Sequence, residues 1–338
     1  MKVTVLGAGA YGVALTSVCF DNNVEVTLWE KFEDIAKQIE KQRFSPKLDS
    51  YILDSKIKVT SDLEMAITGA DLIIVAVPTA VVRAVAKEAS QYIKPEQHIL
   101  LTSKGIEDGT LKFGSEIFLE HYNTNNIAVL SGGSFAIDIV KKDIAKLSLA
   151  TNSEKTNACV KDIMQNDRFL LYTTKDVKGV EIFGAAKNVM AIGSGILHGS
   201  GSSDTTKTSY FIESLHNAKD LAKILGGQSD TMRSPAGMGD MYLTCNSSTS
   251  RNYSFGMLLG KKESQKKVDE YIKDTTVEGL YTLKSIKQLM KHSGANIPLF
   301  DLIQEITTHK QDINALEKYL GKENGVDIFG YQKSKSNK

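Results

Sequence analysis

The chain has 338 residues, and its 41 lysines and arginines are balanced by 40 aspartates and glutamates. This leaves almost no net charge to attract nucleic acid or an anionic membrane surface. The length allows two domains with sizeable cores, and no stretch approaches the roughly 20 unbroken apolar residues of a membrane span. Cys19, Cys159 and Cys245 are too few and too widely spaced for a disulfide framework or a metal site. We therefore expect a soluble, cytoplasmic protein that binds no nucleic acid.

A glycine-rich turn near the N-terminus predicts a dinucleotide-binding site. The apolar run Val3–Leu6 is typical of a buried parallel strand. Gly7, Gly9 and Gly12 follow in G-x-G-x-x-G spacing, and an apolar helical pattern continues over Val13–Phe20. In this motif the glycines allow a tight turn, close approach of the backbone to a pyrophosphate, and close packing of the helix on the strand. Free N–H groups and the positive dipole end at the helix N-terminus then favour the phosphates.

The first half of the chain alternates apolar runs with helical patterns. Further strands are predicted at Val24–Trp29, Ile57–Thr60, Asp71–Val77, Gln97–Thr102 and Ile127–Leu130. Helices are predicted over Asp34–Gln42, from Ser61 as N-cap to Thr68, and over Val81–Tyr92. This alternation indicates an α/β protein with a Rossmann-like, doubly wound, mainly parallel sheet. Ligands bind at the carboxyl ends of such strands, where the glycine turn, Pro78, Lys104 and Ser131–Ala136 fall.

The pattern changes near Val177, where strand-like runs give way to long helical ones. These cover Val180–Ile196, Thr206–Leu225, Asn252–Leu259, Val277–His292 and Leu299–Thr307. We place the domain boundary near Gly179. Residues 1–178 are then a dinucleotide-binding domain, and residues 179–338 an all-α, helical substrate-binding domain with a short basic tail.

A lysine–asparagine pair, Lys187 and Asn188, lies inside an otherwise apolar helical pattern. Gly184 lies one turn earlier on the same side, and with Ala185 and Ala186 it leaves space for another group. Apolar surroundings lower the pKa of a lysine toward the range useful for proton transfer. A lysine that extends to the surface explains the same pattern without any chemistry, and the residues alone leave both interpretations open.

A second dense polar stretch lies further along the helical half. Asp240 and Thr244 are four residues apart, so on a helix they share a face. Ser250 is a good N-cap for a helix that begins at Arg251. Arg251 and Asn252 at such an N-terminus suit a phosphate. A capped surface helix after a polar loop remains the alternative.

Several short motifs occur in a fixed order across both halves. They are Gly7–Gly12, Ser103–Glu107, Ser131–Ala136, Gly179–Glu181, Ala186–Val189, Gly239-Asp240, Leu243–Cys245, Ser250–Asn252 and Val277–Gly279. In these motifs the chain resembles the NAD(P)-dependent glycerol-3-phosphate dehydrogenase family in its bacterial form, from Gly7 to about Thr307. It departs from the family pattern at Tyr11, Gly133 and Thr205, which replace tryptophan, proline and asparagine. Glycine in place of proline at position 133 predicts a less rigid loop over Ser131–Ala136.

The resemblance implies a reversible, NAD(P)H-dependent reduction of dihydroxyacetone phosphate to sn-glycerol 3-phosphate, which feeds glycerophospholipid synthesis, and it implies a homodimer. It implies that Lys187, Lys104 and Asp240 are catalytic, with Lys187 as proton donor and acceptor at the C2 oxygen. The implied substrate-binding residues are Lys104, Gly132, Ser134, Lys187, Asn188, Asp240, Thr244, Ser250, Arg251 and Asn252. The implied cofactor-binding residues are Gly7, Gly9, Ala10, Tyr11, Gly12, Glu30, Lys31, Lys104, Ala136, Arg251 and Glu278.

Glu30, at the end of the predicted strand Val24–Trp29, bears on the choice of cofactor. A carboxylate there accepts hydrogen bonds from the adenosine ribose and repels a 2′-phosphate, an effect that Lys31 offsets in part. We therefore expect NAD in preference to NADP. The six histidines show no metal-ligand spacing, so we expect no metal. The alternatives are a related lysine-dependent reductase, of the 3-hydroxyacid dehydrogenase or ketopantoate reductase type, and a non-catalytic dinucleotide sensor.

Overall fold

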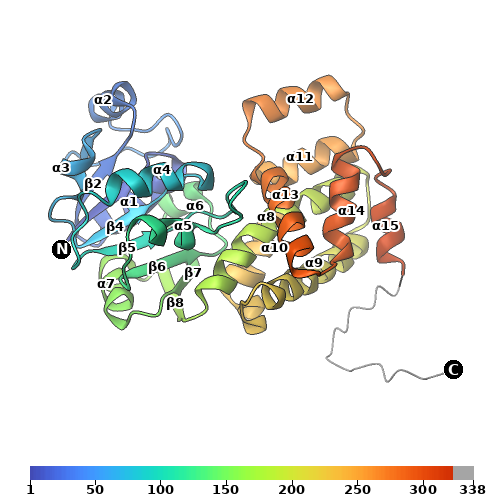
Figure 1. Cartoon of the computed structure of the whole chain (residues 1–338). Helices are drawn as coiled ribbons and strands as arrows, with labels where there is room; N and C mark the ends of the chain where they lie inside the picture. Colours follow the sequence, from blue (N-terminus) through green and yellow to red (C-terminus); the bar gives the residue numbers. More distant parts are fainter. Residues whose placement is uncertain (323–338) are drawn as a thin grey trace.

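The computed structural model describes residues 1–322, so the predicted basic tail lies outside the described residues. The chain folds into two halves that lie side by side (Figure 1). The first half is a sheet covered by helices on both faces, and the second half is built from helices. This arrangement confirms the predicted fold class.

The sheet has eight strands in the order β3-β2-β1-β4-β5-β6-β7-β8. Their bounds are β1 Lys2–Leu6, β2 Glu25–Trp29, β3 Lys58–Thr60, β4 Leu72–Val75, β5 His98–Leu101, β6 Ile127–Ser131, β7 Ala145–Ala150 and β8 Phe169–Thr174. All neighbouring strands are parallel except β6 and β7. The first six strands lie where the sequence predicts them. The last two, β7 and β8, were not predicted.

Helices cover both faces of the sheet, as a parallel sheet requires. They are α1 Ala10–Asp21, α2 Glu33–Gln42, α3 Leu63–Ile67, α4 Thr79–Ala89, α5 Gly114–His121, α6 Ala136–Val140 and α7 Glu154–Met164. Alternate strand residues pack against α1, α6 and α7 on one face and against α3, α4 and α5 on the other. The N-cap of α3 is Asp62, whose carboxylate accepts from the Met65 N–H at 2.9 Å. The prediction of Ser61 as the cap was therefore wrong by one residue.

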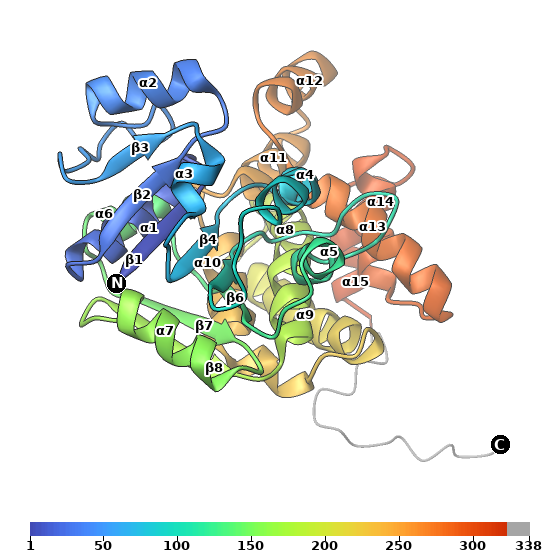
Figure 2. The same cartoon turned by 60° about the vertical axis from the view of Figure 1, so that its left-hand side comes forward.

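The second half surrounds one long central helix, α8. Its helices are α8 Val177–Gly199, α9 Asp204–Ile224, α10 Asp240–Cys245, α11 Arg251–Gly260, α12 Gln265–Asp274, α13 Glu278–Ser293, α14 Pro298–Thr307 and α15 Ala315–Leu320. A 3₁₀ turn over Ser229–Arg233 and a π-helical turn over Pro235–Gly239 precede α10. Both ribbon views place α8 between the sheet and the outer helices (Figures 1 and 2). By length and composition α8 passes as a membrane span, but 94% of its most apolar window is buried inside the protein. In this fold it is therefore a core helix.

Glycines let α8 and α11 pack backbone against backbone. A Cβ at Gly195 would lie 2.1 Å from the Tyr253 carbonyl oxygen, and one at Gly256 would lie 2.0 Å from that of Ile192. A side chain at either position would force the helices apart. This close contact fixes the N-terminus of α11 beside the middle of α8.

Candidate active site

Two lysines share one buried carboxylate where the two halves meet. Lys187 of α8 places its Nζ 2.8 Å from Asp240 Oδ1, and Lys104, which follows β5, places its Nζ 2.6 Å from Oδ2. The Asp240 side chain is 2% exposed, and those of Lys187 and Lys104 are 12% and 15% exposed. Lys187 also donates to Thr244 Oγ1 at 2.9 Å. The structure thus brings together the three residues predicted to be catalytic, together with Thr244.

Burial and mutual attraction act on the protonation states of this group. Burial favours the protonated form of Asp240, but the two lysines outweigh it and hold the pKa of the carboxyl below its usual value. Burial lowers the pKa of Lys187, an effect that Asp240 opposes and the charge of Lys104 reinforces. The site therefore carries a firmly ionised carboxylate and a lysine whose proton is held less tightly than usual.

The helix α8 provides the space in which Lys104 lies. A Cβ at Gly184 would lie 3.1 Å from Ser131 Oγ and 3.6 Å from Lys104 Cγ. Asn188, one turn later on the same face, donates from Nδ2 to the Lys104 carbonyl oxygen at 3.2 Å. The group predicted to approach Gly184 is thus the second lysine of the site.

The loop after β6 connects the lysine pair to the glycine turn. Lys104 Nζ donates to the Gly132 carbonyl oxygen at 3.0 Å. A Cβ at Gly133 would lie 2.6 Å from the Gly239 carbonyl oxygen, so this glycine lets the loop lie directly on the turn that precedes Asp240. Ser134 Oγ then lies 3.1 Å from the hydroxyl of Tyr11, in the first turn of α1.

The three glycines of the first turn differ in their surroundings. Gly7 has φ +114°, and a Cβ there would lie 2.8 Å from the Ala76 carbonyl oxygen. A Cβ at Gly12 would lie 1.9 Å from the Gly7 carbonyl oxygen, whereas one at Gly9 would meet nothing within 4 Å. Two glycines are thus required by the fold, and Gly9 faces open space at the N-terminus of α1, which begins at Ala10. This cradle fits the pyrophosphate of a dinucleotide.

Glu30 and Lys31 follow directly after β2, where the ribose acid was predicted. The Glu30 carboxylate accepts from the Phe32 N–H at 3.2 Å, so its position is held by its own turn. Lys31 lies 3.7 Å from the carboxylate of Glu88 on α4, and both of these side chains are about half exposed. Lys31 is thus paired with Glu88 and not with the neighbouring Glu30.

The N-terminus of α11 lies next to the lysine pair. Ser250 is its N-cap and accepts from the Tyr253 N–H at 3.3 Å, as predicted, and the Arg251 side chain is exposed. Asn252 is buried: its Nδ2 donates to Asn188 Oδ1 at 3.0 Å, and its Oδ1 accepts from the Gly279 N–H at 2.8 Å. Asn252 therefore ties α11 to α8 and α13 as well as lying at the predicted phosphate site.

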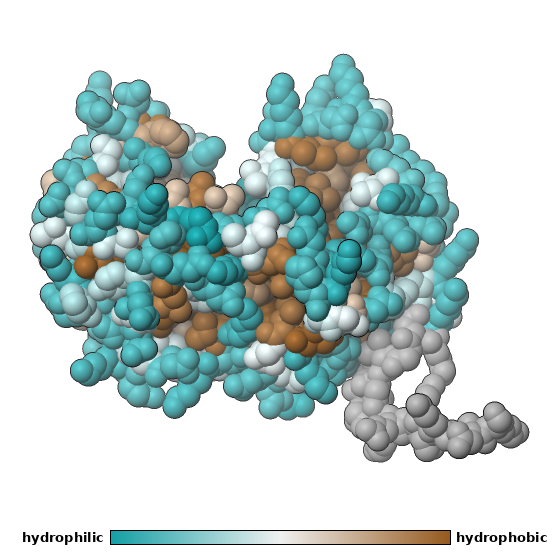
Figure 3. All heavy atoms as spheres, in the orientation of Figure 1, coloured by the Kyte–Doolittle hydropathy of each residue, from teal (hydrophilic) through white to brown (hydrophobic). Residues whose placement is uncertain are grey.

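The two remaining residues of the predicted cofactor site each stand at the start of a helix. Ala136 is the first residue of α6, and Glu278 is the first residue of α13. Glu278 is close enough to Lys187 to oppose the lowering of its pKa. In the space-filling view the surface is hollowed between the two halves (Figure 3).

Comparison with known proteins decides the family. The N-terminal family model of NAD-dependent glycerol-3-phosphate dehydrogenase matches residues 2–157, and the C-terminal model matches residues 176–318. The chain belongs to the NAD-dependent glycerol-3-phosphate dehydrogenase family. It is 33% identical to a glycerol-3-phosphate dehydrogenase (NAD(P)+) from Staphylococcus haemolyticus over 90% of this chain and 93% of that protein. A relative of the same name from Lactococcus lactis subsp. cremoris is 35% identical over 92% of each chain.

A solved structure of the family has the same fold throughout. The glycerol-3-phosphate dehydrogenase from Coxiella burnetii matches with a TM-score of 0.87 at 26% identity, covering 95% of this chain and 98% of that one. The resemblance inferred from the motifs is thereby confirmed for both halves of the chain.

Two residues at this family site had no role assigned from the sequence. Ser131 donates to Asp240 Oδ2 at 3.3 Å, and Thr244 donates to Oδ1 at the same distance, so two hydroxyls join the two lysines around the carboxylate. Glu181 is buried on α8 and binds Ser115 at the start of α5. A signal for Glu181 exists in its spacing, since it precedes Asn188 by seven residues and so lies on the same face of the helix.

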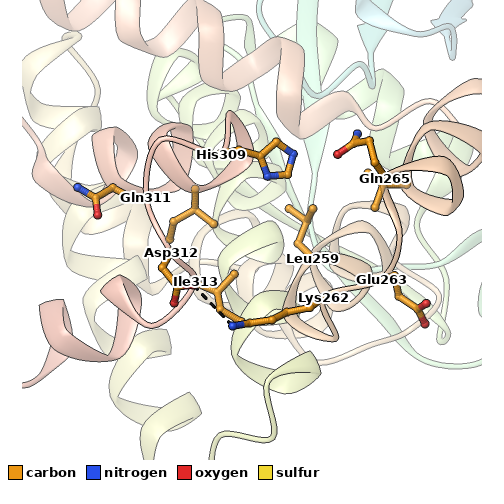
Figure 4. A pocket seen from close by; sticks show the side chains of 10 residues that line it. Leu259, Lys262, Glu263, Gln265, His309, Gln311, Asp312 and Ile313 are labelled. Carbon is orange, nitrogen blue, oxygen red and sulfur yellow. Dashed lines mark ion pairs between the residues drawn. The ribbon is translucent and has the colours of Figure 1, made fainter.

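Another hollow lies at the far end of α11 from Arg251 (Figure 4). It is lined by Leu259, by the connection to α12, and by the connection between α14 and α15. Lys262 and Asp312, which both line it, form an ion pair at 3.6 Å. Among residues 1–322, no group of three or more histidines, cysteines or acids could hold a metal ion, and the expectation of a metal-free enzyme stays a prediction.

Proposed function

We propose that this member of the family reduces dihydroxyacetone phosphate to sn-glycerol 3-phosphate with NAD(P)H, in a reversible reaction. The observation that carries the proposal is the Lys187–Asp240–Lys104 group, which lies beside the dinucleotide cradle at the junction of the two halves. The reaction adds one hydride and one proton to a ketone. When bound, the nicotinamide supplies the hydride to C2.

Lys187 is the residue best suited to supply the proton. Its amine is nearly buried and is held by Asp240 and Thr244, so it has a fixed position. Because burial lowers its pKa, it gives up a proton to the C2 oxygen more readily than an exposed lysine does. Asp240 stays ionised and stabilises the lysine in the protonated state in which it must start.

The charges of the site suit an anionic substrate. Two ammonium groups and one carboxylate leave a net positive charge beside the reacting oxygen, where negative charge develops in the transition state. Arg251 at the N-terminus of α11 is proposed to hold the phosphate, with Ser250 and Asn252 beside it. Gly132, Ser134 and Asn188 are proposed to complete the substrate site.

For the cofactor we propose NAD in preference to NADP. Gly7, Gly9, Ala10, Tyr11 and Gly12 are proposed to hold the pyrophosphate, and Lys104, Ala136, Arg251 and Glu278 the nicotinamide end. The support for NAD is the Glu30 carboxylate at the end of β2, together with the engagement of Lys31 by Glu88. A 2′-phosphate there would meet the negative charge of Glu30, while Lys31 is drawn toward Glu88.

We further propose that residues 1–178 bind the dinucleotide and residues 179–338 the substrate. The family relationship supports a cytoplasmic homodimer whose product enters glycerophospholipid synthesis. Sedimentation of the purified protein tests the dimer, and a monomer across the micromolar range would refute it.

One assay tests the reaction itself. NADH oxidation is followed spectrophotometrically with dihydroxyacetone phosphate and, separately, with unphosphorylated dihydroxyacetone. We expect turnover of the phosphate ester and little of the ketone alone. Equal rates would refute the phosphate anchor, and turnover of a 2-oxo acid instead would favour a ketopantoate reductase or hydroxyacid dehydrogenase type of enzyme. A protein that binds NADH but turns over none of these substrates would be a dinucleotide sensor.

A further inference from the structure

The helix α8 presents three residues to the segment that carries Lys104. Glu181, Gly184 and Asn188 follow one another at intervals of three and four residues, so they form one stripe along the helix. The segment 102–113 connects β5 to α5 and lies against this stripe. The same helix therefore carries Lys187, contacts Lys104 near the start of the segment, and binds Ser115 just beyond its end.

The end of the segment near Lys104 is held by the second half of the stripe. Asn188 donates to the Lys104 carbonyl oxygen, and Gly184 leaves room for the Lys104 side chain. The tip of the segment is held elsewhere, since Glu107 pairs with Arg83 of α4 at 2.6 Å.

Glu181 holds the other end. The residue is 5% exposed, and its carboxylate accepts from the Ser115 N–H at 2.8 Å and from Ser115 Oγ at 2.7 Å. Ser115 is the second residue of α5, so the carboxylate also lies at the positive end of that helix. A Cβ on the neighbouring Gly114 would lie 2.6 Å from Ser103 Oγ. The start of α5 thus packs directly on the residue that precedes Lys104.

We propose that Glu181 is a positioning residue for Lys104. It fastens the start of α5 to α8, and through the Gly114–Ser103 contact it fixes the distance between Lys104 and Lys187. Lys104 and Lys187 belong to different halves of the protein. A contact that fastens the two halves together is therefore needed to keep both lysines on the same carboxylate. This inference rests on the proposed function, because its test measures turnover of dihydroxyacetone phosphate.

The charged groups around Glu181 are consistent with a structural clamp. Glu116 of α5 and Lys178 of α8 lie near it, and they form an ion pair with each other at 2.5 Å. Burial raises the pKa of Glu181 to about 7, which the two bonds from Ser115 oppose. Among the described residues, Ser115 is the hydrogen-bond partner of this carboxylate, and Lys178 acts on it from beyond its ion pair with Glu116.

The test is a double-mutant cycle with Lys104. Glu181→Ala and Glu181→Gln are made alone and together with Lys104→Met, and kcat and KM for dihydroxyacetone phosphate are measured. We expect Glu181→Ala to lower kcat/KM by about 10-fold or more when Lys104 is present, because small displacements of a catalytic group are costly. With Lys104→Met the same change should cost less than about 2-fold. Glu181→Gln keeps an acceptor for Ser115 and should restore kcat/KM to within about 3-fold of the wild type.

Asp176 offers a matched control. Its buried carboxylate accepts from the Gly179 N–H at 2.9 Å, from the Gln228 N–H at 2.9 Å and from the Thr231 hydroxyl, and these three partners lie outside segment 102–113. Asp176→Asn should change stability without any coupling to Lys104→Met. If Glu181→Ala does not fold, Ser115→Ala removes only the hydroxyl bond and enters the same cycle.

An equal loss of kcat/KM in the two Lys104 backgrounds would overturn the proposal. An inactive wild type would instead refute the proposed function. In that case amide hydrogen exchange decides about Glu181: exchange in segment 102–113 must accelerate in Glu181→Ala and stay unchanged in Asp176→Asn. Unchanged exchange in Glu181→Ala would overturn the clamp.

Discussion

Lys104 and Lys187 contact opposite oxygens of the same buried carboxylate, at 2.6 Å and 2.8 Å from Asp240. One lysine follows a strand of the sheet and the other lies on the central helix of the second half. A single carboxylate therefore links the two halves, at the place where we propose that the substrate meets the nicotinamide. Removing Asp240 would leave two like charges unpaired in a nearly dry site, whereas removing either lysine leaves one ion pair.

Replacing Lys187 tests the proton transfer. Lys187→Ala is expected to lower kcat by at least about 100-fold, the usual scale for a general acid or base. Lys207→Ala is the control, because this lysine of α9 pairs with the exposed Asp204 and lies outside the site. Steady-state kinetics of NADH oxidation measure both variants. A Lys187→Ala enzyme with near-normal kcat would contradict the mechanism and favour a sensor.

The pH dependence of reduction tests the pairing with Asp240. Reduction requires a protonated Lys187, whose pKa is lowered by burial and supported by Asp240. The rate of reduction should therefore fall as pH rises through a pKa below the ordinary lysine value, and the rate of oxidation should rise. Asp240→Asn removes the supporting charge, so this alkaline limb is expected at lower pH, with kcat/KM reduced by about 100-fold. An unmoved limb in kcat-versus-pH profiles would show that another group titrates.

Alanine substitutions at two glycines of the turn should affect different properties, one the stability of the fold and the other the affinity for NADH. Gly12→Ala places a Cβ 1.9 Å from the Gly7 carbonyl oxygen, so it should lower the melting temperature markedly. Gly9→Ala meets nothing within 4 Å and should change the melting temperature little. It should instead raise the Kd for NADH, because the methyl group occupies the space for the pyrophosphate. Calorimetry and NADH fluorescence titration separate the two effects, and tight NADH binding by Gly9→Ala would argue against a pyrophosphate at that place.

The strands easiest to predict were those made mostly of buried apolar residues. β1 and β4 are buried on both faces and stand out as continuous runs. β8 escaped prediction because its second half, residues 172–174, is polar and partly or fully exposed, which weakens the apolar run at the edge of the sheet. Ser61 and Asp62 are both good caps, and only the backbone geometry distinguishes them.

The residues of the candidate site could be predicted from the sequence, but the ion pairs and hydrogen bonds between them could not. Lys104 and Asp240 are 136 residues apart, and nothing local predicts that they form an ion pair. The same holds for Asn252, which the sequence places at a phosphate-binding helix end. Its bonds to Asn188 and Gly279 depend on the packing of three helices. Tertiary contacts of this kind follow from the fold and leave no mark on spacing along the chain.

Cofactor preference depends on Glu30. Glu30→Ala removes the charge that opposes a 2′-phosphate, so it should raise kcat/KM for NADPH relative to NADH by about 10-fold or more. Glu88→Gln frees Lys31 from its 3.7 Å partner and should shift the ratio in the same direction by a smaller factor. Kinetics with both reduced cofactors measure the ratio. A wild type that prefers NADPH would contradict the role given to Glu30.

Glu181 predicts a specific dependence of stability on pH. Its pKa rises from 4.5 to about 7 on folding, with burial as the main cause. At low pH the carboxyl is protonated in both states and imposes no cost. As pH rises from about 4.5 to about 7 the unfolded chain ionises first, so the free energy of unfolding falls by up to about 3 kcal/mol and then levels off. Glu181→Gln cannot ionise, so its stability relative to the wild type should increase by that amount between pH 4.5 and pH 8.

Ser115→Ala removes a hydrogen bond that lowers the pKa of Glu181, so the fall in stability should extend to higher pH in this variant. Urea unfolding at several pH values measures these differences, and parallel curves for Glu181→Gln and the wild type would mean that the carboxylate is not buried as described.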